Sequence, residues 1–270
     1  MTSEGLPPVL LVGAGRMGGA LFGGWVARGL APSALVDPAP TPGIGRPGDI
    51  VAAVAADLPR DFVPAAVVLA VKPQMADEAM PALAAVLPPG CVVLSIMAGR
   101  RIAGIAASIG GRHAVVRAMP NTPASIGRGI TVACAGPGGT GAQRDLCDRL
   151  LAAVGEVAWV QDEALIDPVT AVSGSGPAYV FLLAELLEQA GIAEGLPAEL
   201  ARLLARKTIS GAGALLDASP EDAASLRRAV TSPRGTTEAA LAVLMDEAAW
   251  PHSVEAAVRA ATNRARELAS

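Results

Sequence analysis

The residues best suited to chemistry lie near the N-terminus, where three glycines follow a short apolar run. Gly13, Gly15 and Gly18 come directly after Val9–Val12, and an apolar helical stretch follows them. In this spacing the first glycine permits a tight turn, the second lets the backbone approach a pyrophosphate, and the third lets a helix pack closely on a strand. A second apolar pair ends in Asp37, where a ribose hydroxyl would need an acceptor. The pattern predicts a dinucleotide-binding βαβ unit; a glycine-rich turn that binds nothing is the alternative.

The first half of the chain alternates strand patterns with helical patterns. Strands are predicted at 9–12, 35–36, 67–71, 91–96, 114–118, 130–134 and 157–160, and helices at 20–27, 75–87, 102–109 and 142–154. Such alternation is typical of a largely parallel, doubly wound sheet with helices on both faces. Ligands bind such sheets outside the carboxyl ends of the strands, where Asp37, Lys72 and Asn121 stand. Asn121 lies between two prolines that stiffen its backbone; a turn-forming asparagine is the alternative.

The second half, from about Glu163, shows helical patterns and no further strand. Helices are predicted at about 177–190, 197–216, 220–230, 236–249 and 253–268, interrupted at 173–177 and 231–237. Both interruptions place hydroxyls and backbone N–H groups directly before a helix, which suits a carboxylate. Capping by Ser and Thr explains one hydroxyl per helix and leaves the others unexplained. The predicted fold class is an α/β N-terminal Rossmann-like doubly wound sheet, residues 1–162, followed by an all-α C-terminal domain, residues 163–270.

The composition is that of a soluble enzyme. The 270 residues fit about two domains of roughly 150 residues each. A net charge of −4 without a basic patch argues against nucleic acid as a partner. The apolar runs are short and end in charged residues, and no secretory signal pattern begins the chain, so neither a membrane span nor export is expected. The three scattered cysteines lack CxxC spacing, which favours structural thiols in the cytoplasm.

The titratable residues narrow the reaction. His113 and His252 have no motif around them, and no cluster has metal-ligand spacing, so no metal is expected. Tyr179 is not followed by a lysine four residues later, so a Tyr-x-x-x-Lys reductase pair is absent. Reduction of a ketone usually calls for a strong general acid at the oxygen, and none is evident. An imine nitrogen can arrive already protonated, so hydride addition to an imine needs orientation more than acid catalysis.

The chain resembles the pyrroline-5-carboxylate reductase family over nearly its whole length. The matching segments are 13–18, 70–74, 95–99, 119–123, 172–179 and 231–241, of which the last two are the specific ones. The resemblance implies reduction of 1-pyrroline-5-carboxylate to L-proline with NADPH or NADH, the last step of proline synthesis. It also implies that residues 163–270 bind the substrate and form a homodimer or a higher homo-oligomer.

The same resemblance assigns roles to residues. The cofactor-binding candidates are Gly13, Gly15, Arg16, Met17, Gly18, Asp37, Ala70, Val71, Lys72, Pro73 and Asn121. The substrate-binding candidates are Ser173, Ser175, Ser232, Gly235, Thr236 and Thr237. The substrate carboxylate is expected at the N–H groups of Gly235 and Thr236. Thr237 is the catalytic candidate, because its hydroxyl is expected to orient the imine nitrogen and share its proton; an N-cap threonine is the alternative.

Two positions depart from the family pattern. Arg234 replaces the first glycine of the usual Ser-Pro-Gly-Gly-Thr-Thr run. If that glycine has a positive φ, Arg234 carries strain, although its charge could equally attract an anionic substrate. Asp37 stands where many relatives place small polar or basic residues that hold a 2′-phosphate. We therefore expect Asp37 to favour NADH, unless Arg46 or another nearby arginine offsets its charge.

Two alternative functions belong to different classes. A reductase of another cyclic imine, or of a hydroxyacid, would keep the glycine fingerprint and alter segment 231–237, which is largely intact. A non-catalytic dinucleotide-binding protein would be expected to lose Asn121 or the hydroxyls. The helices after Ala164 carry more apolar positions than a small bundle can cover, which predicts at least a homodimer with its active site at the domain junction.

Overall fold

The computed structural model describes residues 5–269, apart from the side chains of Pro73, Asp77 and Glu78. The chain forms two compact units, each of which is described by itself. Unit 1 comprises residues 1–174 and 261–270, and unit 2 comprises residues 175–260. The division therefore falls after Gly174, beyond the predicted boundary at residue 162. Segment 163–174 and the C-terminal residues belong with the sheet.

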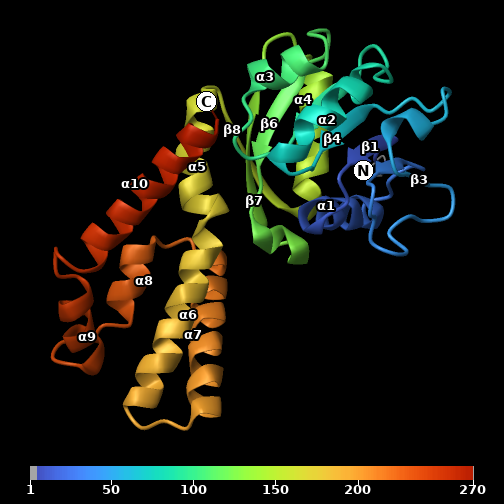
Figure 1. Cartoon of the computed structure of the whole chain (residues 1–270). Coiled ribbons are helices and arrows are strands. Elements are labelled where there is room, and N and C mark those ends of the chain that lie inside the picture. Colours follow the sequence, from blue (N-terminus) through green and yellow to red (C-terminus); the bar gives the residue numbers. More distant parts are fainter. Residues whose placement is uncertain (1–4, 270) are drawn as a thin grey trace. The chain divides into compact units, whose positions relative to one another are not determined.

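Within residues 5–269 the strands of unit 1 form one eight-stranded sheet, ordered β3-β2-β1-β4-β5-β6-β7-β8 (Figure 1). The strands are β1 (Val9–Val12), β2 (Ala34–Val36), β3 (Ile50–Ala52), β4 (Ala66–Leu69), β5 (Val92–Ser95), β6 (Val115–Met119), β7 (Gly129–Ala135) and β8 (Gly155–Val160). Neighbours run parallel except β6 and β7, which are antiparallel. The central strands are continuous buried apolar runs, as expected for a sheet covered on both faces.

Helices cover both faces of this sheet. They are α1 (Arg16–Ala27), α2 (Pro73–Ala84), α3 (Ile102–Ser108), α4 (Gly141–Leu151) and the short α5 (Ile166–Val169). Val9 and Leu11 of β1 pack in one cluster with buried residues of α1 and α4, whereas Leu10 and Val12 pack in a second cluster with those of α2 and α3. Successive strand residues thus point to opposite faces. The predicted doubly wound α/β architecture is confirmed.

Two details of the sheet differ from the sequence prediction. The edge strand β3 was not predicted, because it is a run of three residues, only part-buried, after a stretch rich in Pro and Gly. The pairing of β6 with β7 reverses direction, which the apolar pattern of a buried strand does not encode.

Unit 2 is helical, as predicted. It contains α6 (Gly176–Ala193), α7 (Ala198–Ala218), α8 (Ala223–Ala229), α9 (Thr236–Leu244) and most of α10 (Trp250–Leu268). Helices α6 and α7 pack together, since a Cβ at Gly191 would lie 3.3 Å from the Cβ of Ala201. Many large apolar side chains of α6 and α7 are nevertheless exposed, Phe181 and Leu203 among them. Among the described residues, the helical stretch Glu163–Ala193 is long and apolar enough to cross a membrane by length and composition, and little of its most apolar part is buried.

Candidate active site

The glycine loop between β1 and α1 has the geometry of a dinucleotide site. Gly13 has a φ of +94°, and a Cβ there would lie 2.8 Å from the backbone of Ala70. A Cβ at Gly18 would lie 2.1 Å from the carbonyl oxygen of Gly13. Gly15 is different, because it is exposed and a Cβ there would meet nothing within 4 Å. The first and third glycines are therefore required by packing, whereas the second faces open space that a ligand can occupy.

The N-terminus of α1 is suited to an anion. Gly15 is the N-cap, no side chain caps the helix, and no acidic residue lies in its first turn. The N–H groups of the first turn, which includes Arg16 and Met17, have no partner within the helix and carry its positive dipole end. This end of α1 therefore fits the pyrophosphate of a dinucleotide.

Asp37 lies against the same loop. Its Oδ2 accepts a hydrogen bond from the backbone N–H of Ala14 at 2.6 Å, and its Oδ1 accepts one from Ala39 at 2.8 Å. A carboxylate has about four lone-pair sites, so two remain after these bonds. Asp37 thus braces the loop and keeps capacity for ribose hydroxyls.

The side chain of Arg46 is held by hydrogen bonds to Asp49 and Leu30. Its Nε and Nη2 donate to the carboxylate of Asp49 at 2.8 and 2.9 Å, and its Nη1 donates to the carbonyl of Leu30 at 3.0 Å. Burial alone would raise the pKa of the Asp49 carboxyl. Hydrogen bonds from Arg46 and from backbone amides lower this pKa by more than burial raises it, so the pKa lies below its ordinary value. The expectation that Arg46 offsets the charge of Asp37 therefore loses its support, because this guanidinium is held in place by Asp49.

The other cofactor candidates lie where parallel strands end. Ala70 and Val71 directly follow β4, and the Ala70 N–H donates to the carbonyl of Val12 at 2.8 Å, which ties the ends of β1 and β4 together. Lys72 is the exposed N-cap of α2, which begins at Pro73. The side chain of Pro73 is not among those that the structure describes. The carboxyl ends of β1 and β4 meet where the strand order changes direction, the position at which open α/β sheets bind ligands.

Asn121 joins a predicted cofactor residue to a predicted substrate residue. It follows β6, its Oδ1 accepts from the Ile130 N–H at 3.0 Å, and its Nδ2 donates to Ser173 Oγ at 3.4 Å. The oxygen and the nitrogen of the Asn121 side-chain amide therefore both make hydrogen bonds, which is more than a turn-forming asparagine needs. Ser173 belongs to unit 1, and the remaining substrate candidates belong to unit 2.

In unit 2, segment 231–237 leads into α9, and within it the Thr231 hydroxyl donates to the carbonyl of Arg227 at 2.7 Å. Gly235 is the N-cap and makes no side-chain bond, so the N-cap alternative for Thr237 is wrong: Thr237 is the second residue of the helix. Within residues 5–269 the Thr237 hydroxyl, which is half-buried, has no protein partner. The Gly235 N–H donates to the carbonyl of Ser232 at 3.0 Å, so this predicted carboxylate donor is already engaged. Ser175, at the N-cap of α6, likewise makes no capping bond.

Arg234 carries the strain expected from its position. Its φ is +58°, and it is the one non-glycine residue with a positive φ among those described. Its backbone N–H donates to Glu238 Oε2 at 2.6 Å, and its side chain is exposed. The condition under which strain was expected at Arg234, a positive φ, is therefore met.

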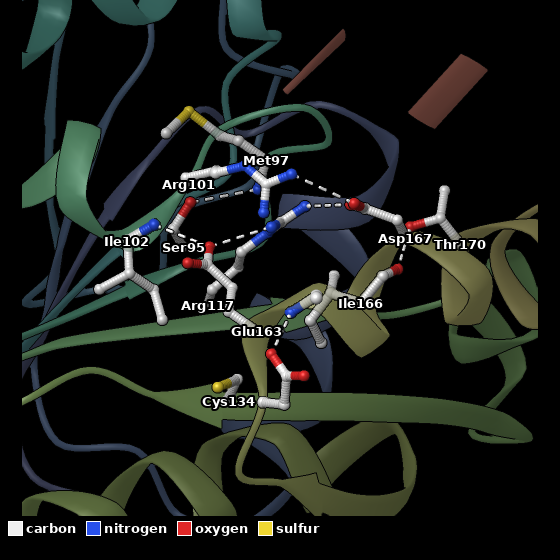
Figure 2. A network of polar contacts seen from close by, with 12 residues as sticks. Ser95, Met97, Arg101, Ile102, Arg117, Cys134, Glu163, Ile166, Asp167 and Thr170 are labelled. Atoms are coloured by element: carbon white, nitrogen blue, oxygen red, sulfur yellow. Dashed lines mark hydrogen bonds and ion pairs between the residues drawn. The ribbon is translucent and has the colours of Figure 1, made fainter. Parts of the chain in front are cut away.

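Sequence reasoning missed a group of four charged residues, of which Arg117 and Asp167 are buried (Figure 2). Arg117, on β6, donates to Glu163 Oε1 at 3.0 Å and to Asp167 Oδ1 at 3.5 Å, and Arg101 donates to Asp167 Oδ2 at 3.3 Å. Glu163 Oε1 also accepts the N–H of Ile102, the first residue of α3, at 2.8 Å. The sequence did contain one sign of this group, which is Arg117 itself. A charged side chain inside an apolar strand needs a buried partner of opposite charge.

The three cysteines offer no nucleophile. Cys91, Cys134 and Cys147 are buried and unpaired. Burial raises the pKa of Cys91 and of Cys147 to about 12, so both stay protonated near neutral pH. Only a thiolate is reactive, so these side chains act as core residues.

Comparison with known proteins agrees with this geometry. Residues 163–268 match the family model for pyrroline-5-carboxylate reductase dimerisation. A pyrroline-5-carboxylate reductase of Pseudomonas aeruginosa is 41% identical over 268 residues, covering 97% of each chain. A pyrroline-5-carboxylate reductase structure from Coxiella burnetii is 32% identical with a TM-score of 0.87 and covers 97% of this chain and 98% of that one. A structure of a pyrroline carboxylate reductase from Plasmodium falciparum, with NADP bound, is 27% identical with a TM-score of 0.84 and covers 97% of this chain and 98% of that one. This chain is a member of the pyrroline-5-carboxylate reductase family.

Proposed function

We propose that this protein reduces 1-pyrroline-5-carboxylate to L-proline with NADPH or NADH, the last step of proline biosynthesis. The observation that carries the proposal is the relative with 41% identity over 97% of both chains. The glycine loop and the strand-end residues of unit 1 support it independently, because their geometry fits a dinucleotide. A cytoplasmic location is part of the same proposal and follows from family membership.

In this proposal unit 1 holds the cofactor. The first turn of α1 takes the pyrophosphate, Asp37 accepts from the adenosine ribose, and Ala70 to Pro73 and Asn121 line the nicotinamide side. The bound dinucleotide supplies the hydride. Asn121 is held at both ends of its amide, by Ile130 and Ser173, so its orientation is fixed before any ligand arrives.

The substrate residues then orient an imine that needs little acid catalysis. The first turn of α9 offers the Thr236 N–H and the positive end of the helix to the substrate carboxylate, with the hydroxyls of Ser173, Ser175 and Ser232 as further partners. The Thr237 hydroxyl donates to or accepts from the imine nitrogen and shares its proton as the neighbouring carbon is reduced. Its lack of a protein partner within residues 5–269 leaves it available for this bond.

We also propose that the functional form is a homodimer built through residues 163–268. The family model that matches this segment describes dimerisation. The exposed apolar side chains of α6 and α7 need a cover, and the membrane-length stretch Glu163–Ala193 lies inside the matched segment. A second copy of the chain is therefore a better occupant of this surface than lipid.

The decisive experiment follows NADPH oxidation on addition of racemic 1-pyrroline-5-carboxylate and identifies proline as the product. Loss of one transition-state hydrogen bond in Thr237→Val is worth roughly 1–3 kcal/mol, a fall of about 5- to 150-fold in kcat/KM, with dinucleotide affinity unchanged. Thr237→Ser keeps the hydroxyl at the same position of α9 and is expected to retain near wild-type kinetics. Wild-type activity in folded Thr237→Val would show that the hydroxyl takes no part in the reaction.

A further inference from the structure

The buried charges around Arg117 are not used by the proposed reaction and need an explanation. The side chains of Arg117 and Asp167 are 1% and 2% exposed. Moving such ions out of water costs several kcal/mol each unless partners compensate. Two arginines and two carboxylates balance the formal charge, yet the buried Arg117 Nε has no hydrogen-bond partner in the described part of the chain.

The cluster joins segments that are distant in sequence (Figure 2). Arg117 lies on β6 and Arg101 directly precedes α3, whereas Glu163 and Asp167 come from the segment that follows β8. Glu163 and Asp167 lie 46 and 50 residues beyond Arg117. The four side chains therefore fix α5 and the turn before it against β6 and β7.

Two short chain segments lead from this cluster to one hydrogen bond. Along β6, Arg117 is followed by Met119 and then by Asn121. Along the other segment, α5 continues from Asp167 into a π-helical turn, Thr170–Gly174, that carries Ser173. Single π turns inside helices are frequently found at functional sites. The two segments meet again where Asn121 Nδ2 donates to Ser173 Oγ at 3.4 Å.

This geometry is sensitive to small movements. At 3.4 Å the Asn121–Ser173 bond lies at the long end of hydrogen-bonding distances, so a shift of a few tenths of an ångström breaks it. Asn121 is also anchored by the Ile130 N–H, whereas the Ser173 hydroxyl has this one partner within residues 5–269. A displacement of α5 would therefore move Ser173 and leave Asn121 in place.

Stability alone is a weak reason for such a cluster. Replacing a buried ion pair by apolar residues of similar volume is often neutral or stabilising, whereas the pair can specify one arrangement of the segments it joins. We propose that Arg117 and Asp167 are positioning residues for the reductase reaction: they fix α5 on β6 so that Ser173 lies beside Asn121. This inference rests on the proposed function, because Ser173 is its expected substrate contact.

The first test is Asp167→Asn, which keeps the shape of the side chain and removes its charge. Misplacing a substrate-positioning group by about 1 Å can lower the rate about 100-fold, so we expect kcat/KM for 1-pyrroline-5-carboxylate to fall about 10- to 100-fold. The dissociation constant of NADPH, measured by fluorescence, stays unchanged because Asn121 keeps its anchor. Asp145→Asn, the same substitution at an exposed position of α4, keeps wild-type kinetics.

A second variant separates positioning from stability. Arg117→Met combined with Asp167→Leu replaces the pair by apolar side chains and is expected to restore the melting temperature. If the pair only stabilises the fold, this double variant recovers full activity, and the proposal is overturned. If the pair positions Ser173, kcat/KM stays low in a protein of wild-type stability. This variant decides the question even if Asp167→Asn fails to fold.

Two further measurements identify the path. Ser173→Ala combined with Asp167→Asn should lose less activity than the product of the single losses, because both changes remove the same contact. Multiplicative losses would overturn the proposal. Independently of turnover, the amides of 170–174 should exchange with solvent faster in the double apolar variant while those of β6 do not; unchanged exchange would also overturn it. Absence of proline formation by the wild-type protein would instead overturn the proposed function.

Discussion

Replacing Arg234 by glycine is expected to stabilise the protein, although it deletes a long side chain. Arg234 is held at a φ of +58°, where the Cβ of an L-residue crowds its own backbone. Its backbone N–H bond to Glu238 survives the change, since glycine keeps the same amide. The guanidinium is exposed and has no protein partner among residues 5–269, so its removal breaks no contact.

The magnitude follows from two opposing effects. A left-handed conformation costs a non-glycine residue roughly 1–2 kcal/mol, which glycine avoids. Glycine loses more conformational freedom on folding, which costs about 0.5–1 kcal/mol. The free energy of unfolding should therefore rise by about 0.5–1 kcal/mol, equivalent to an increase of about 1–3 °C in Tm for a chain of this size.

Arg112→Gly is the matched control, because it makes the same change at an exposed position with a negative φ. Without strain to relieve, Arg112→Gly should lower the free energy of unfolding by about 0.5–1 kcal/mol. The two variants should thus shift Tm in opposite directions, measured by calorimetry at one protein concentration because assembly affects Tm. If Arg234→Gly lowers Tm as much as Arg112→Gly does, the strain argument is wrong.

Three other predictions concern the cofactor, the cysteines and the assembly. Asp37 should repel a 2′-phosphate, so the wild-type protein should prefer NADH in kcat/KM, and Asp37→Ser should shift the ratio toward NADPH by about tenfold; a strong wild-type preference for NADPH would contradict this. Cys91 and Cys147, whose pKa values burial raises to about 12, should not react with a thiol reagent at pH 8 until the protein unfolds. The unfolded chain releases these thiol protons near pH 9, whereas the folded chain keeps them. The urea concentration at the midpoint of unfolding should therefore fall as pH rises from about 9 toward 12. A midpoint that rises over this range would show that burial does not raise these two pKa values. Light scattering should report a dimer or larger assembly, and an active monomer at micromolar concentration would exclude our assembly proposal.

The parts of the site that were predictable from sequence depend on local spacing. A Cβ at Gly13 or Gly18 would clash with atoms of the same turn or of the neighbouring strand end, so the spacing of the glycines, together with the strand before them and the helix after them, predicts the loop. The strain at Arg234 was equally local, since a single φ requirement explains why glycine is usual there. Strands with continuous apolar runs were also found, because they are buried on both faces.

The parts that were not predictable depend on distant residues. The pattern around Arg117 indicated a buried strand but not that its partners, Glu163 and Asp167, lie in a segment assigned to the other domain. For the same reason the predicted boundary at residue 162 differs from the division after Gly174. In the sequence, the strand pattern gives way to a helical pattern at Glu163, which is why the boundary was predicted there. The segment 163–174 is nevertheless held to unit 1 by ion pairs with Arg117, and hydrophobic periodicity does not reveal ion pairs.

The hydroxyls of the chain's threonines show how structural and functional roles differ. Thr140 caps α4 and accepts from the Gln143 N–H, while Thr170 and Thr231 each donate to the carbonyl of the residue four positions earlier. These hydroxyls complete local hydrogen bonding and need no ligand. Thr237 is different: it is the second residue of α9, Gly235 is the cap, and the Thr237 hydroxyl has no partner in residues 5–269. A half-buried hydroxyl without a structural bond is available to a ligand, and that is why the substitution Thr237→Val tests chemistry rather than folding.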